Sequence, residues 1–312
     1  MKKHLSSAAI LSVLILVLCL HSFAAEDDSF GSGMRPSLSS GSGYLFSSVQ
    51  DTVYTDYVDV IPSILSTDIR TYLHTEPDII VNGTPIGHMT AKATINDTAY
   101  VAAVPVLQCL YPSAVIGCQD GHLTAAAADM VLHANAGDAY FQVNEQYVYA
   151  PDLVIEKDGT LLLPVGPLCD ALGCSVLYGQ DLIIRQVAPV VTGHTYIEED
   201  LYWLSHAIYS ESGNQPMKGR IAVGTVILKR VASPRFPNTI KEVVFAPGQF
   251  SPVANGTIYR DPDKDSIVAA KLCLDGVQEA KDCLYFNVTS MHSWADRSRT
   301  YFCTIGGHNF YL

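Results

Sequence analysis

Apolar residues recur at the helical period in one stretch beyond the middle of the chain. Leu204 and Ile208 follow Leu201 by three and seven positions, which is the spacing of one face of an α-helix. Glu211 lies on the same stripe, and the polar residues 212–214 then interrupt the pattern. The pattern predicts a helix that begins near Glu198, Glu199 and Asp200, ends at Glu211 and is followed by a break.

A second helix is predicted after the break, through about Val231. Asn214 and Pro216 suit a helix cap and a first turn. Its buried face consists of Ala222, Val223, Val226 and Ile227. Further on we expect a short helix over 239–244, a loop rich in Gly and Pro over 246–252, a helix over 266–276, and strands over 283–288 and 301–311, the second interrupted by Gly306 and Gly307.

A carboxylate at the end of an apolar stripe suggests chemistry. Partial desolvation and the negative end of the helix dipole both raise the pKa of a carboxyl group. A carboxyl group that stays protonated near neutral pH can serve as a general acid. The alternative is structural: Glu211 is a solvated residue of the last turn, or it pairs with Lys218 or Arg220.

The region from Ile79 to Gln186 repeats itself at an offset of about 61 residues. The matching segments are 97–101 with 158–162, 114–116 with 175–177, 119–120 with 180–181, and Val81-Asn82-Gly83 with Val143-Asn144-Glu145. Each copy is predicted to form a strand, a turn, a strand, a short helix, a turn and a strand, because Asn-Gly, Asn-Asp and Asp-Gly favour turns. These residues resemble the copper amine oxidase N-terminal-like stalk module, a repeated α+β accessory unit of exported bacterial proteins. The family name implies no copper here.

The N-terminus has the features of an export signal. Lys2 and Lys3 precede an apolar run over 8–20, and small residues at 22 and 24 suit a signal peptidase. We therefore expect residues 1–24 to be a signal peptide, with an uncleaved signal anchor as the alternative. The domain order that follows is a Ser- and Gly-rich tether over 25–48, a stalk-like accessory module over 49–186, a linker over 187–197 and a last domain over 198–312.

Charge divides the exported chain into two parts. Removing the two lysines of the signal peptide changes the formal charge from -12 to -14. Residues 25–197 hold 5 basic and 19 acidic side chains, whereas residues 198–312 hold 12 of each. This acidic balance argues against nucleic acid as a partner, and no membrane association is expected once the signal is cleaved.

Seven cysteines remain after cleavage, and in an exported chain Cys109 and Cys118 are candidates for a disulfide. The sequence has no Cys-x-x-Cys motif, and its histidines have neither His-x-His nor His-x-x-Glu spacing. We therefore expect no metal and no cofactor. A metal-dependent amidase, which needs clustered ligands, stays open as an alternative.

Residues 198–312 resemble the SleB-type cell wall hydrolases, the spore cortex-lytic enzyme family. The matching elements, in order, are 207–211, Gly219 with 222–223 and 226–228, Arg230, 236–237, 249–251, 285–287, and 305–306 with His308 and Phe310. Lys229 stands where the family usually has Asn, and Ser212-Gly213-Asn214-Gln215 replaces the usual Ala-Arg-Gly-Glu. The resemblance implies that Glu211 is the catalytic acid of an enzyme that cuts peptidoglycan glycan strands.

The implied reaction is that of a lytic transglycosylase, in which Glu211 donates a proton and later accepts one. A hydrolytic muramidase would need a second carboxylate, for which Asp282 and Asp296 are candidates. Aromatic rings, amides and hydroxyls bind sugars, so we expect a sugar groove lined by Gln249, Phe250, Tyr285, Asn287 and His308. Trp294 could also face a sugar, whereas we expect Trp203 to pack between domains.

The expected fold class is α+β. It combines a mostly helical, lysozyme- or transglycosylase-like catalytic domain, a small C-terminal β element and the repeated accessory module. Expected partners are peptidoglycan strands, in the cell wall, spore cortex or medium, and other wall or spore proteins through the stalk module. A non-catalytic wall-binding protein is the alternative from a different class, because the repeats alone would suffice for adhesion.

Overall fold

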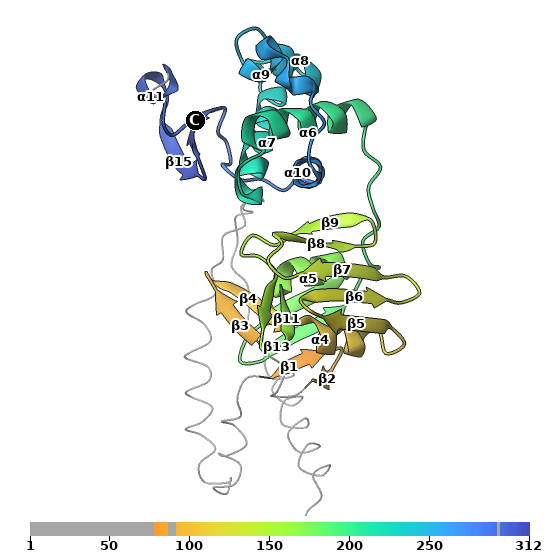
Figure 1. Cartoon of the computed structure of the whole chain (residues 1–312). Helices are drawn as coiled ribbons and strands as arrows, with labels where there is room; N and C mark the ends of the chain where they lie inside the picture. The colour runs from red at the N-terminus through yellow and green to blue at the C-terminus, as the bar shows by residue number, and fades with distance from the viewer. Residues whose placement is uncertain (1–77, 87–91, 292–293) are drawn as a thin grey trace, which may run out of the picture. The chain divides into compact units, whose positions relative to one another are not determined.

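The structure, a computed structural model, describes residues 78–86, 92–291 and 294–312 (Figure 1). The predicted signal peptide, the tether and residues 49–77 of the predicted accessory module lie outside the described residues. Every described residue belongs to one compact unit. None of the helices in the described ranges has the length and apolar character needed to cross a bilayer.

Residues 79–186 form three sheets and two short helices. The strands are β1 (Ile79–Val81), β2 (Thr84–Pro85), β3 (Lys92–Ile95), β4 (Thr98–Ala102), β5 (Val115–Gln119), β6 (His122–Ala126), β7 (Val131–Asn135), β8 (Tyr140–Val143), β9 (Gln146–Tyr149), β10 (Ile155–Lys157), β11 (Thr160–Pro164), β12 (Cys174–Tyr178) and β13 (Leu182–Gln186). The helices are α4 (Ala103–Leu110) and α5 (Val165–Ala171). The sheet orders are β12-β13-β1-β2, β10-β11-β4-β3 and β5-β6-β7-β8-β9.

The order strand, strand, helix, strand, strand occurs twice in this region, first from β3 to β6 and then from β10 to β13. The two runs pair with each other, since β11 lies antiparallel to β4 with Leu162 opposite Ala102. Tight hairpins start each run. Asn96 and Asp97 have positive φ between β3 and β4, and Asp158 and Gly159 have positive φ between β10 and β11. Asn, Asp and Gly tolerate this conformation best, so the predicted turn signals lie where hairpins form.

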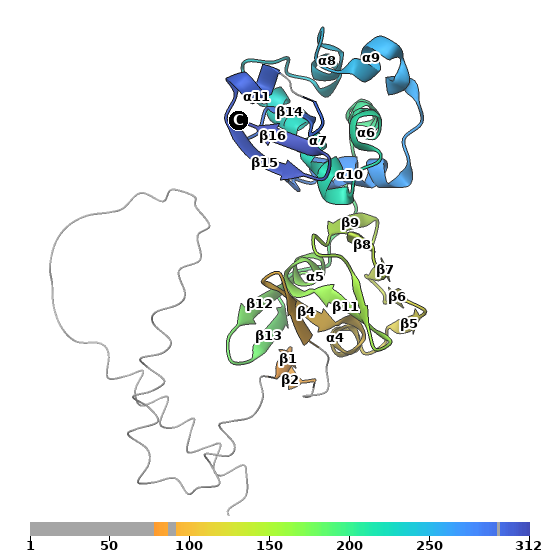
Figure 2. The same cartoon turned by 60° about the vertical axis from the view of Figure 1, so that its left-hand side comes forward.

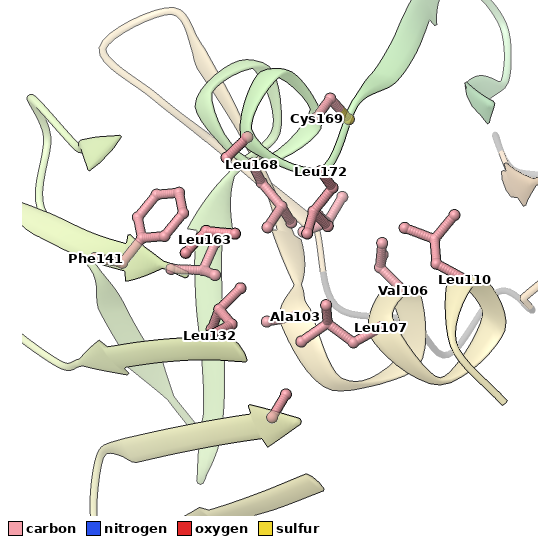
Figure 3. Close-up of a cluster of buried hydrophobic side chains, with 14 of the residues drawn as sticks. Ala103, Val106, Leu107, Leu110, Leu132, Phe141, Leu163, Leu168, Cys169 and Leu172 are labelled. Carbon is pink, nitrogen blue, oxygen red and sulfur yellow. The ribbon is translucent and has the colours of Figure 1, made fainter. Parts of the chain in front are cut away.

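One apolar core fills the space between these sheets and the two helices (Figure 3). Leu107 on α4 and Leu168 on α5 are completely buried, as are Leu132 on β7 and Leu163 on β11. Figure 3 shows these side chains pointing toward one another from their separate elements. Burial of each such side chain is worth about 1.5–3 kcal/mol, so the core holds the short strands together.

Residues 198–312 form the mostly helical part of the fold. Its elements are α6 (Glu198–Ser212), α7 (Met217–Val231), α8 (Ile240–Phe245), α9 (Ser251–Asn255), the 3-10 helix η1 (Thr257–Tyr259), α10 (Lys264–Leu274), β14 (Tyr285–Val288), α11 (Trp294–Ser298), β15 (Tyr301–Ile305) and β16 (His308–Tyr311). The predicted pair of helices around the 212–214 break is confirmed as α6 and α7. The small sheet has the order β14-β16-β15, and Figure 2 shows it beside α7.

Two short α-helices were not predicted. α9 begins inside the segment that we expected to be a Gly- and Pro-rich loop, and α11 follows β14 where no element was expected. Both have five residues. A helix of this length has too few turns to show the apolar period from which helices are predicted.

The contacts between the accessory region and the helical region do not involve the tryptophan that we expected there. Trp203 packs edge-on against Phe245 of α8, with ring centroids 4.9 Å apart, so the expectation that it lies between domains is wrong. The accessory region instead reaches α10 and its following loop through tyrosines: the hydroxyl of Tyr140 donates to Asp265 at 3.3 Å, and that of Tyr149 donates to Glu279 at 3.1 Å.

The cysteines do not form the expected pair. All seven cysteines in the described part of the chain are free, including the disulfide candidates Cys109 and Cys118. Cys109 is half-buried, and its thiol donates to the carbonyl oxygen of Val81 at 3.6 Å, whereas Cys118 is exposed on β5. The disulfide predicted between these two residues is therefore absent.

Candidate active site

Glu211 is the penultimate residue of α6 and is half-buried. Burial raises its pKa to about 7, and the positive charge of Arg230 opposes this rise. The raised pKa agrees with the expectation from the sequence, and loss of water around the carboxyl group is its main cause. Near neutral pH this group is a mixture of carboxylic acid and carboxylate, so it can both donate and accept a proton.

The two ion pairs considered for Glu211 are not formed. Nζ of Lys218 lies 4.0 Å from a carboxylate oxygen of Glu279. Nη1 of Arg220 lies 2.5 Å from a carboxylate oxygen of Asp263. Both cations therefore have other partners, and the structural alternative based on these pairs is wrong.

Arg220 holds the turn that follows Glu211. Its Nη2 donates to the carbonyl oxygen of Gly213 at 2.5 Å, and its Nε donates to that of Gln215 at 3.0 Å. Its Nη1 is held by Asp263, the N-cap of α10, and by the hydroxyl of Ser266 at 2.6 Å. The buried Arg220 side chain thus ties the break between α6 and α7 to the start of α10. This fixes the direction in which α6 ends.

A second link joins the same turn to the small sheet. Oε1 of Gln215 accepts a hydrogen bond from the backbone N–H of Gly307 at 2.7 Å. Gly307 lies in the turn between β15 and β16, so the loop after the catalytic candidate and the C-terminal hairpin are held together. A side chain at the neighbouring Gly306 would have its Cβ 2.4 Å from the same oxygen, so the close approach requires glycine there.

Arg230 is a buried cation beside Glu211. Its side chain is 5% exposed, and its guanidinium carbon lies 5.3 Å from the ring centroids of Phe236 and Phe250 and 5.8 Å from that of Tyr285. Its Nε donates to the carbonyl oxygen of Leu284 at 2.8 Å. Nη1 has no hydrogen-bond partner among the described residues. Burial lowers the pKa of Arg230 to about 10, so the group stays cationic at neutral pH.

The five residues expected to line a sugar groove separate into two groups. Gln249 is exposed in the loop before α9, and Tyr285 and Asn287 are half-buried on β14. Phe250 and His308 are 5% and 3% exposed, so in this structure they pack behind the surface and present almost none to a ligand. Burial also lowers the pKa of His308, which favours the neutral imidazole.

Asn287 is fixed by its neighbours. Its Nδ2 donates to the carbonyl oxygen of Met291 and to Asp296, each at 3.0 Å, and its Oδ1 accepts from the hydroxyl of Tyr311 at 3.1 Å. The hydroxyl of Tyr311 also donates to Asp296. The other candidate for a second carboxylate, Asp282, is exposed and lies 3.4 Å from Nζ of Lys229. Each of these two carboxylates therefore already has a partner.

Sequence reasoning did not assign a site role to Arg230, Gln215 or Tyr311. Each acts through contacts with residues far away along the chain, for which local patterns hold no signal. In the described ranges, no group of three or more His, Cys, Asp or Glu side chains is arranged to hold a metal ion.

Comparison with known proteins supports the family resemblance for this part of the chain. Residues 214–311 match the family model described as Cell Wall Hydrolase. The chain carries a cell wall hydrolase domain at its C-terminus. The matched segment begins three residues after Glu211, so the match itself does not include that residue.

The cell wall hydrolase domain is similar to spore cortex-lytic enzymes. The chain is 35% identical to that of Bacillus cereus over 119 residues, which are 37% of this chain and 45% of the relative. It is 33% identical to that of Bacillus subtilis strain 168, over 37% of this chain and 38% of the relative. The chain therefore matches less than half the length of these curated relatives.

A solved structure is also similar in sequence. The catalytic domain of the germination-specific lytic transglycosylase SleB from Bacillus anthracis is 33% identical, covering 39% of this chain and 100% of that chain, with a TM-score of 0.36. The cell wall hydrolase domain is thus the part of the chain that these relatives share.

Proposed function

We propose that this protein is an exported enzyme that cuts the bond between N-acetylmuramic acid and N-acetylglucosamine in peptidoglycan, as a lytic transglycosylase. The observation that carries the proposal is Glu211, a half-buried carboxyl group with its pKa raised to about 7, beside a segment that matches the cell wall hydrolases. The spore cortex-lytic relatives support peptidoglycan as the substrate class.

Glu211 serves in both halves of the reaction. As the acid, it gives its proton to the glycosidic oxygen while the bond from that oxygen to C1 of the muramyl unit breaks. As the carboxylate, it then takes the proton of the muramyl 6-hydroxyl while O6 forms a bond to C1. The products are a 1,6-anhydromuramyl end and an N-acetylglucosamine with a free 4-hydroxyl. The carboxyl group ends in its starting protonation state, so no second carboxylate and no water are consumed.

The positive charge of Arg230 suits the second half of this reaction, in which Glu211 acts as a carboxylate. A buried positive charge stabilises the carboxylate form of Glu211, and this form exists between the two proton transfers. The aromatic rings around Arg230 hold that charge in place without neutralising it, because a ring attracts a cation but carries no net charge.

The remaining parts of the chain have supporting roles in this proposal. Residues 1–24 direct export, residues 25–48 act as a tether, and residues 49–186 form a stalk-like accessory module with two repeats, followed by a linker over 187–197. Gln249, Tyr285 and Asn287 contact sugars, with Phe250 and His308 supporting them from behind. The enzyme then acts in the cell wall, in the spore cortex or outside the cell.

The test is digestion of purified peptidoglycan by residues 25–312, with Glu211→Gln and Glu198→Gln alongside. Glu198 is an exposed carboxylate in the first turn of α6, so it is a matched control for the charge change. We expect soluble fragments with anhydromuramyl ends, identified by mass spectrometry, from the wild type and Glu198→Gln only. Reducing ends would indicate hydrolysis, as by a muramidase. Full activity of Glu211→Gln would contradict the role of Glu211, and lack of any product would favour a binding protein.

A further inference from the structure

A stack of cations and aromatic rings extends away from Arg230. Tyr285 is shared by two arginines, with Arg230 5.8 Å and Arg299 4.7 Å from its ring centroid. Arg299 also lies over Trp294, 4.3 Å from that ring centroid. The rings of Tyr285 and Trp294 are 5.8 Å apart and meet edge to face. We call Arg230, Tyr285, Arg299 and Trp294 the cation-aromatic stack.

The outer end of this stack is available to a ligand. Trp294 is 55% exposed although it is a large apolar side chain. Arg299 forms no ion pair within the described ranges. Its Nη1 donates to the carbonyl oxygen of Ser298 at 3.0 Å, and its Nη2 donates to the hydroxyl of Tyr285 at 3.4 Å, so both hydrogen bonds go to uncharged oxygens. Its buried Nε has no partner among the described residues.

A guanidinium that lies between two rings and forms no ion pair is suited to an anionic ligand. Arginine binds carboxylates through two parallel hydrogen bonds and keeps its charge at any physiological pH. The flat face of an exposed indole provides a surface on which the apolar face of a sugar ring can lie. A muramyl unit of peptidoglycan has both features, because it is a sugar whose lactyl side chain carries a stem peptide with free carboxylates or, where the peptide is absent, ends in a free carboxylate.

The stack also connects this outer end to the candidate catalytic group. Arg230, at the inner end, acts electrostatically on Glu211, and Tyr285 contacts both arginines. A polymer whose scissile bond lies at Glu211 would extend past several sugar units on either side, so a second contact along its path would add affinity.

We propose that Trp294 and Arg299 form a subsite for a muramyl unit, with the sugar ring on the indole and a carboxylate of the muramyl side chain on the guanidinium. This rests on the proposed function, because it takes the glycan strand as the ligand. The carboxylate belongs to the attached stem peptide or, at muramyl units without a stem peptide, to the lactyl group itself. Both sources present the same chemistry to Arg299.

The test measures binding rather than cleavage. Residues 25–312 with Glu211→Gln are incubated with peptidoglycan in three forms: intact insoluble wall, insoluble wall amidated so that its carboxylates become neutral, and glycan strands that are stripped of stem peptides, so that the lactyl carboxylates are free, and are immobilised on beads. Arg299→Gln and Arg299→Lys are compared with Arg297→Gln, which removes an exposed arginine of α11, the helix that ends directly before Arg299. Trp294→Ala is compared with Tyr259→Ala, which removes another exposed aromatic side chain.

We expect Arg299→Gln to weaken binding to intact wall by about tenfold, the effect of one lost charge-assisted hydrogen bond, and to leave binding to amidated wall unchanged. Arg299→Lys restores part of the loss. An effect that disappears on stripped strands identifies a carboxylate of the stem peptide, whereas an effect that becomes larger there identifies the lactyl carboxylate, which stripping frees. Trp294→Ala weakens binding to all three forms, whereas both control variants bind as the parent does.

Equal losses for Arg299→Gln on intact and amidated wall would overturn the subsite, as would equal losses for Arg297→Gln. Thermal unfolding of each variant, followed by far-ultraviolet circular dichroism, checks that the fold is retained, and an Arg299 variant that is not folded is replaced by Arg299→Met. Failure of the proposed function is distinguishable, because it appears in the digestion test as absence of product from the wild type, whereas this test needs no catalysis.

Discussion

Gln215 and Gly307, 92 positions apart in the chain, are joined by a hydrogen bond of 2.7 Å between Oε1 and the backbone N–H. Gln215 stands where the resembling family usually has Glu. A carboxylate and an amide both offer an oxygen at this place, so the departure from the family pattern keeps the acceptor that the hairpin turn requires.

We expect Gln215→Ala to lower the free energy of unfolding by about 1 kcal/mol, because it leaves the N–H of Gly307 without its acceptor. Activity on peptidoglycan should fall as well, even under conditions in which the variant is fully folded, since the turn after Glu211 loses its link to the C-terminal hairpin. Gln215→Glu should retain both properties. Chemical denaturation and release of soluble fragments measure the two effects, and equal activity of Gln215→Ala and the wild type would disprove the positioning role.

Gly306 and Gly307 should respond differently to alanine. Gly306 has φ of +57° and its added Cβ would lie 2.4 Å from Oε1 of Gln215, whereas a Cβ at Gly307 would lie 3.1 Å from Nε2 of the same side chain. We expect Gly306→Ala to be destabilised by about 1–3 kcal/mol through backbone strain and displacement of Gln215, and Gly307→Ala by less. Thermal unfolding of the two variants compares them directly, and the reverse order would contradict this account.

The raised pKa of Glu211 predicts a pH-dependent cost to stability. The folded protein binds this proton more tightly than the unfolded chain, whose Glu pKa is about 4.3. Stability from this group is therefore full below about pH 4.3 and is lost as the pH rises toward 7. We expect Glu211→Gln to be more stable than the wild type at pH 8, by up to about 3 kcal/mol, with little difference at pH 4. Glu198→Gln should show no such pH dependence in thermal unfolding.

Activity should depend on the same ionisation. Because Glu211 must be protonated to donate, kcat/KM should fall as the pH rises through about 7. Removing the positive charge in Arg230→Met should raise the pKa of Glu211, so that this fall moves to higher pH while the maximal rate decreases. Arg230→Lys keeps a cation and should keep the wild-type profile more closely. Among the described residues, Arg230 is the charged group that lowers the pKa of Glu211, so an unchanged profile in Arg230→Met would rule out this coupling.

The local part of the fold was predictable from the sequence, because its signals come from neighbouring residues. The period of Leu201, Leu204 and Ile208 predicted α6, and the polar break predicted the turn before α7. The position of Glu211 at the end of an apolar stripe and of a helix predicted the direction of its pKa shift. The hairpin turns at Asn96-Asp97 and Asp158-Gly159 followed from residues that tolerate positive φ.

The sequence by itself thus determined the longer helices, the hairpin turns and the candidate catalytic carboxyl group, since each depends on contacts within a few positions. Only the tertiary structure decided what surrounds Glu211. It brought Arg230 beside it, joined Gln215 to Gly307, paired Arg220 with Asp263, and buried Phe250 and His308 instead of exposing them. These contacts span tens of residues, and their geometry depends on how α6, α7, α10 and the C-terminal sheet pack together, which no local periodicity records.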